Sequence, residues 1–352
     1  MTTLGIIWFV LIFVLIAGYF ILDGFDLGAG VLSPFICKNE EEKAIVRQSI
    51  GPVWDGNEVW LLTAGGALFA AFAPAYATTF SGFYMAIFLV LLGLIVRAIS
   101  LEFAAHDKEW RGVYDKFFFV GSLLPALLLG VAVGNVYAGI PLDANGDYVG
   151  VALLGLVTPF TLLTGLLGLA MFLAQGATWI SMKAPKPSEL QARATRLRLP
   201  LQVAALAMFG VVSVYAHVAF GAEHMDPTLT VLRFVFAIAV VALIVASIVM
   251  GKKKECDIAP FILQSASAAA LVGLWASSMF PNLVFAGAGD PLSIFATAAS
   301  GVNITIANAA STDLALAWML GITAVGLPLV LIYHFIIYRT FRGRVRIDEL
   351  EY

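Results

Sequence analysis

Two aspartates lie inside the first apolar run of the chain, where a carboxylate is energetically costly. Asp23 and Asp26 stand in the segment LDGFDLGAG, within a run that begins at Gly5. A charge in the middle of a membrane helix costs about 2.5 to 3.5 kcal/mol on insertion scales, and such residues usually serve a function. Their spacing of three residues places both carboxylates on one helical face. Because the glycines of this segment let a neighbouring backbone approach closely, we expect that face to be buried against protein.

Further charged residues stand at the ends of the next two apolar runs. Asp55 and Glu58 lie where the second run begins, and Arg97 and Glu102 lie near the end of the third. An arginine keeps its proton inside proteins, so Arg97 needs a carboxylate or a set of carbonyl groups beside it. Asp55 has an alternative interpretation, as the N-cap of the helix that follows it.

The sequence offers few residues for other kinds of reactive centre. Its four histidines are His106, His217, His224 and His334. His217 and His334 fall near opposite ends of their helices, so they are not expected to ligate one haem iron, and we interpret them as satisfied polar residues at helix ends. Cys37 and Cys256 are isolated thiols in loops, from which we expect neither a disulfide nor a metal site.

The composition is that of a polytopic membrane protein. Of the 352 residues, 61% are hydrophobic and 12% are charged, which is far more apolar than a soluble domain. The net charge of -3 forms no basic patch for nucleic acid, and the sequence has no phosphate-binding glycine loop. About 20 apolar residues cross a bilayer, and on that rule we predict nine membrane spans. The expected spans are 5–34, 57–77, 80–103, 117–140, 154–182, 199–220, 231–251, 260–285 and 314–338.

The basic residues predict the orientation of the chain. All of the 20 lysines and arginines except Arg97 and Arg233 lie after the odd-numbered spans, and short cytoplasmic loops carry an excess of such residues. The N-terminus is therefore expected outside and the C-terminus inside. We expect Arg233 to reach the outer interface with its long side chain.

This orientation gathers the buried charges in the inner half of the membrane, a pattern that suits a proton path from the cytoplasm. A second interpretation remains open, in which these charges only pair with one another and lock three helices together.

Several long segments resemble subunit II of the cytochrome bd quinol oxidases, the terminal oxidases of bacterial respiratory chains. The resemblance rests on LDGFDLGAG at Leu22, GPVWDGNEVWLLTAGGALFAAF at Gly51, FSGFYMAIFLVLLGLIVRAISLEF at Phe80, VGNVYAGIP at Val133 and QGATW at Gln175. These segments occur in the first half of the chain. Beyond about Met182, only hydropathy and length agree with the family.

The resemblance implies a fold, a partner and a location. The expected fold has a first four-helix bundle over 1–142, a second over 143–285, and an outer loop, ninth helix and cytoplasmic tail over 286–352. The expected partner is subunit I, which in this family carries the b and d haems and the quinol site, so that this chain holds no haem. The complex would lie in the bacterial cytoplasmic membrane. A small single-span subunit and a structural quinone bound to this chain remain open.

The resemblance also implies roles for single residues. Positions matching Asp26, Asp55 and Arg97 belong to a water-filled proton path toward the oxygen-reducing site. Asp23 and Glu102 are neighbours that we include in it. Glu58 can be an amide in relatives, which argues against an obligatory proton role for that residue.

The competing functional class is a proton-coupled secondary transporter, which also buries acids beside glycine-rich helices. The sequence shows no convincing pair of broken helices in matching positions of the two halves, and the charges gather on one side of the membrane. A purely structural partner of a catalytic subunit is a third interpretation.

Overall fold

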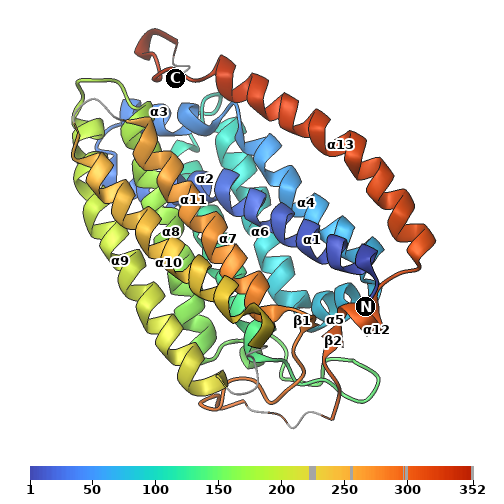
Figure 1. The fold of residues 1–352 in the computed structure, drawn as a ribbon. Helices are drawn as coiled ribbons and strands as arrows, with labels where there is room; N and C mark the ends of the chain where they lie inside the picture. The colour runs from blue at the N-terminus through green and yellow to red at the C-terminus, as the bar shows by residue number, and fades with distance from the viewer. Residues whose placement is uncertain (222–226, 254–256, 296, 298–299, 350–352) are drawn as a thin grey trace.

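The computed structural model describes residues 1–221, 227–253, 257–295, 297 and 300–349, and helices dominate it (Figure 1). Eight of the described helical segments are long and apolar enough to cross a membrane, by length and composition. They are Thr3–Ile36, Tyr84–Phe103, Arg111–Ala138, Pro159–Lys183, Glu189–Phe220, Pro227–Gly251, Ile258–Met279 and Asp313–Thr340. The prediction of an all-helical, multi-pass membrane protein is thus confirmed. His224, and Cys256 with its expected loop position, lie outside the described residues.

The first span is interrupted at Asp23, which separates α1 (Thr3–Leu22) from α2 (Gly24–Ile36). Helix α8 (Pro159–Lys183) crosses α2 at very short range. A Cβ on Gly28 would lie only 1.9 Å from the carbonyl oxygen of Phe172. The close approach expected for the glycine-rich segment is therefore confirmed, and α8 is the helix that makes it.

The second expected span, 57–77, forms two helices, α4 (Trp54–Ala71) and α5 (Ala73–Gly82), which Phe72 separates. Helix α6 (Tyr84–Phe103) then follows the third expected span closely. Helix α4 is not among the eight apolar segments, because its first two turns carry polar residues. A ninth span therefore stays a prediction.

The second half of the chain contributes long helices that pack beside α7 (Figure 1). The helices of this region are α7 (Arg111–Ala138), α8, α9 (Glu189–Phe220), α10 (Thr230–Gly251) and α11 (Ile258–Met279). Helix α8 begins later than the expected residue 154, because Thr158 caps it in a capping box with Thr161. Residues Leu154–Leu156 form a short 3₁₀ turn, η1, instead.

Helix α11 ends before the expected residue 285, because Pro281 cannot continue a helix. Residues Asn282–Val284 form strand β1, which pairs antiparallel with β2 (Ile304–Thr305). The short helix α12 (Ile306–Ala309) follows β2, and these elements lie at the end of the molecule that holds the N-terminus (Figure 1).

The last helix, α13 (Asp313–Thr340), runs along the outside of the other helices toward the opposite end, where the C-terminus and α3 (Glu40–Ile50) lie (Figure 1). Most of its apolar side chains are exposed, and Leu316 and His334 are its buried residues. Short 3₁₀ turns η2 (Pro227–Leu229) and η3 (Ile347–Glu349) complete the described elements. The start of α1 and the end of α13 thus lie at opposite ends of the molecule.

Candidate functional site

Arg97 joins three helices through two carboxylates. Its guanidinium is fully buried, and Nη2 lies 2.6 Å from Asp23 Oδ1 and 2.6 Å from Glu58 Oε1. Asp23 stands at the α1–α2 interruption, Glu58 on α4 and Arg97 on α6. The expectation that Arg97 needs a carboxylate beside it is confirmed, and the fold supplies two.

Asp26 takes a different partner, the amide of Asn57. Asn57 Nδ2 donates to Asp26 Oδ2 at 2.7 Å and to the carbonyl oxygen of Leu22 at 3.0 Å. The Tyr338 hydroxyl of α13 donates to Asn57 Oδ1 at 2.9 Å. Sequence reasoning missed Asn57 and Tyr338. The signal for Asn57 was its position between Asp55 and Glu58 at the start of an apolar run.

The buried group of Asp23, Asp26, Glu58 and Arg97 contains more acidic than basic side chains. In the described part of the chain, Asp23, Asp26 and Glu58 face one cation, Arg97, and Asp23 and Asp26 are completely buried. Within the described residues Asp26 forms no ion pair, whereas the other two acids do. Unbalanced charges in a low-dielectric interior are costly, and Asp26 is the acid of this group whose hydrogen bond comes from a neutral amide rather than from Arg97.

The group is surrounded by buried polar atoms that have no hydrogen-bond partner among the residues described. These atoms are Asp26 Oδ1, Arg97 Nε and Nη1, Ser122 Oγ and Gln175 Oε1. Each such atom costs about 1–3 kcal/mol if nothing satisfies it, and buried water is the usual partner. Donors and acceptors are both present among these atoms.

Asp55 and Glu102 lie at the solvent side of this group. Asp55 is exposed in the first turn of α4, and it is a charged neighbour of Glu58. The N-cap of α4 is Val53, without a side-chain bond, so the alternative of Asp55 as N-cap is wrong. Glu102 is exposed and lines a cavity of about 180 Å³ together with Arg47. The described part of the chain shows no ion pair between either acid and Arg97.

His334 is a satisfied buried residue, as predicted. Its Nε2 accepts a hydrogen bond of 3.2 Å from Trp60 Nε1, and its Nδ1 lies 2.9 Å from the carbonyl oxygen of Val330. His217 lines a different part of the structure, the apolar cavity described next. Among the described residues, no group of three His, Cys, Asp or Glu side chains could hold a metal ion.

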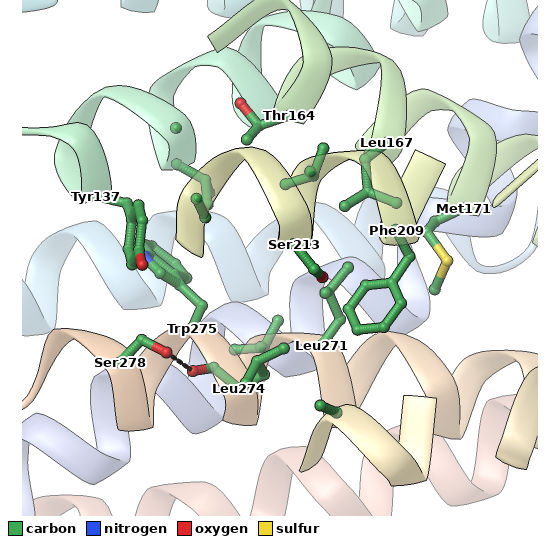
Figure 2. A pocket seen from close by; sticks show the side chains of 18 of the residues that line it. Tyr137, Thr164, Leu167, Met171, Phe209, Ser213, Leu271, Leu274, Trp275 and Ser278 are labelled. Carbon is green, nitrogen blue, oxygen red and sulfur yellow. Dashed lines mark hydrogen bonds between the residues drawn. The ribbon is translucent and has the colours of Figure 1, made fainter. Parts of the chain in front are cut away.

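An apolar cavity of about 410 Å³ lies among α7, α8, α9, α10 and α11 (Figure 2). Its walls are mainly aliphatic and aromatic, with Phe209, Leu271 and Trp275 among them, and Thr164 and Ser278 add hydroxyl groups. Such a lining suits an apolar or amphipathic molecule with few polar groups. Asp23, Asp26, Glu58 and Arg97 are not among the described residues that line this cavity, so the two places are chemically distinct.

Comparison with known proteins agrees with these features. Residues 4–341 match the family model described as cytochrome bd terminal oxidase subunit II. The chain is 33% identical to cytochrome bd ubiquinol oxidase subunit 2 of Bacillus subtilis strain 168 over 363 residues, covering 99% of both proteins. It is 43% identical to cytochrome bd-I ubiquinol oxidase subunit 2 of Escherichia coli strain K12 over 209 residues, which are 58% of this chain and 54% of the relative.

The match to the Escherichia coli protein thus spans about half the length of that relative. A solved structure of the bd oxidase from Geobacillus thermodenitrificans contains a chain with the same fold. The TM-score is 0.75 at 16% identity, covering 97% of this chain and 99% of that one.

Proposed function

Because the chain belongs to the cytochrome bd terminal oxidase subunit II family, we propose that it is the second subunit of a quinol oxidase and carries cytoplasmic protons toward the oxygen-reducing site. The proposed complex oxidises quinol to quinone and reduces oxygen to water in the bacterial cytoplasmic membrane. Subunit I, the proposed partner, holds the b and d haems and the quinol site. This chain holds no haem in the proposal.

The buried group around Arg97 is the observation that carries this proposal. Arg97 holds Asp23 and Glu58 by ion pairs of 2.6 Å, which leaves Asp26 as the acid free to gain and lose a proton. A fixed cation beside a titrating acid balances its charge, and surrounding polar atoms bind the water through which protons move. In the proposed path, Asp26 passes the proton on further inside the membrane, and the positive charge of Arg97 offsets the negative charge of the acids.

The cytoplasmic start of the path is formed by exposed acids. Asp55 collects protons at the start of α4, where Glu58 is its charged neighbour, and Asp26 receives them deeper in the membrane. Glu102 contributes from the nearby cavity of about 180 Å³. Protons taken up here meet oxygen in the partner, while quinol oxidation releases protons on the outer side. Charge separation then follows without a pump.

The proposal requires the predicted topology, with nine spans, the N-terminus outside and the C-terminus inside. Helix α4 is the proposed ninth span, with its polar residues at the cytoplasmic end. The start of α1 and the end of α13 lie at opposite ends of the molecule in Figure 1, which supports an odd number of spans. The division into two four-helix bundles, 1–142 and 143–285, followed by 286–352, remains part of this proposal.

The apolar cavity among α7 to α11 is the proposed place for a structural quinone. Its volume of about 410 Å³ and its apolar walls suit a ring with an isoprenoid tail. A small single-span subunit in the complex stays an open expectation.

Purification of a tagged copy from its native membrane in mild detergent tests the proposal. We expect a reduced-minus-oxidised visible spectrum with a d-haem band and a second large membrane subunit that co-purifies. A colourless protein that purifies alone in good yield would contradict the oxidase function and favour the proton-coupled transporter. The interruption of the first span at Asp23 is the observation that favours that second candidate.

A further inference from the structure

Asn57 is fully buried, and each hydrogen-bonding group of its side chain has a partner. Nδ2 donates to Asp26 Oδ2 at 2.7 Å and to the Leu22 carbonyl oxygen at 3.0 Å. Oδ1 accepts from the Tyr338 hydroxyl at 2.9 Å. Residues from α1, α2, α4 and α13 therefore meet at one amide.

The chemistry of these partners defines which way the amide points. The Leu22 carbonyl oxygen can only accept, so a nitrogen must face it. Turning the amide over would place Oδ1 against both Leu22 O and the Asp26 carboxylate, and it would leave Nδ2 facing the Tyr338 oxygen. The observed orientation satisfies every group at once, and Tyr338 stabilises it from α13.

We propose that Asn57, held by Tyr338, is a positioning residue that gives the two oxygens of Asp26 different tasks. Oδ2 remains a hydrogen-bond acceptor in both protonation states, while Oδ1 takes up and releases the transferred proton. The reason is that a protonated carboxyl group accepts better through its carbonyl-type oxygen than through its hydroxyl oxygen, so the N–H of Asn57 keeps the proton on Oδ1. Oδ1 is also the buried Asp26 oxygen without a partner among the residues described. This inference rests on the proton path proposed above.

Several other groups face Asp26 and contribute to its charge balance. The titratable or charged groups around it are Asp23, Glu58, Arg97 and Tyr338, and Tyr19 interacts with Asp23, Arg97 and Glu58. Helices α7 and α8 add Ser122 and Gln175, which do not titrate. All of these are retained when Asn57 is changed, so an altered pH dependence would report the lost amide.

Asn57→Leu removes the N–H donor but keeps the branching and the number of heavy atoms of the side chain. The ionised form of Asp26 then loses a charge-assisted hydrogen bond, so a higher pH is needed to ionise it. The acidic limb of the pH profile of quinol oxidase turnover should move up by about one to two pH units. The infrared carbonyl band of protonated Asp26, identified by its loss in Asp26→Asn, should shift in frequency.

Tyr338→Phe keeps the aromatic packing against Phe25 and Trp179 but removes the hydroxyl that holds Asn57 Oδ1. A smaller shift of the same band and the same limb is expected, because both Nδ2 bonds remain. Tyr76→Phe is the matched control. Its ring stacks on Phe80 in α5, away from the buried group, and the variant should behave as wild type.

All variants are measured in the whole complex beside Asp26→Asn. If Asp26→Asn keeps wild-type turnover, the proposed proton path fails, and the inference fails with it. If Asp26→Asn is slow but Asn57→Leu keeps the wild-type pH profile and carbonyl band, the path stands and this inference is overturned. If Asn57→Leu fails to assemble, the carbonyl band of Tyr338→Phe is the deciding measurement. A shifted band supports the inference, and an unchanged band overturns it.

Discussion

Replacing Arg97 by methionine should be one of the most destabilising single changes in the chain. The substitution keeps a long side chain but removes the cation that pairs with Asp23 and Glu58 at 2.6 Å. The Asp23 side chain is 0% exposed, whereas that of Glu58 is 21% exposed and can recruit water. Breaking a buried pair from one side costs about 3–5 kcal/mol, and Asp23 should account for most of that cost.

The same reasoning predicts a rescue. Buried ion pairs are often worth little more than a neutral replacement, so adding Asp23→Asn to Arg97→Met should recover most of the lost stability. Arg47→Met is the control, because its pair with Asp115 at 2.7 Å has side chains 12% and 23% exposed. That change should cost about 1 kcal/mol or less.

Thermal unfolding of the purified complex in mild detergent measures these differences. Arg97→Met should lower the midpoint by about 4–7 °C, and the double variant should regain most of it. A single variant that unfolds at the wild-type temperature would refute the account of the ion pairs. So would a double variant that is no more stable than the single one.

Three further predictions concern packing, reactivity and topology. Gly28→Val should prevent stable assembly of the complex, because a Cβ at this position would lie 1.9 Å from the Phe172 carbonyl oxygen. Gly66→Ala is the control, since a Cβ there meets no atom within 4 Å. Size-exclusion chromatography should show an assembled complex for Gly66→Ala but not for Gly28→Val. Burial raises the pKa of the Cys37 thiol from 9.0 to about 11. In a Cys256→Ser variant, alkylation of Cys37 at pH 8 should therefore be roughly a hundredfold slower than alkylation of an ordinary thiol, and it should accelerate as the pH rises. Rapid labelling of Cys37 at pH 8 would contradict this prediction. In intact cells, an impermeant maleimide should label Asn145→Cys but not Lys108→Cys, and the reverse result would overturn the predicted orientation.

The composition of the buried group was predictable in part because charges inside apolar runs are costly. That cost singled out Asp23, Asp26 and Arg97, and it required a carboxylate beside Arg97. This cost could not predict which acids pair with Arg97, since Glu102, five residues further along the same helix, was also a candidate. The fold selects Asp23 and Glu58 because α6 packs where the α1–α2 interruption and the start of α4 meet.

The neutral members of the site carried no such signal. An asparagine costs less than a charge in a membrane, and Tyr338 lies 281 residues from Asn57 in the chain. Their contact depends on how α13 returns along the other helices, which periodicity alone does not reveal. Helix ends were displaced for local reasons that hydropathy ignores, namely the Thr158 capping box and Pro281 after α11.

The most direct test of the central claim is proton uptake by the reconstituted complex carrying Asp26→Asn. In liposomes driven by quinol, the account predicts that proton uptake from the cytoplasmic face and oxygen reduction both slow by about a hundredfold, while subunit assembly and the haem spectrum remain those of wild type. Wild-type rates of uptake and oxygen reduction in a fully assembled Asp26→Asn complex would contradict the account.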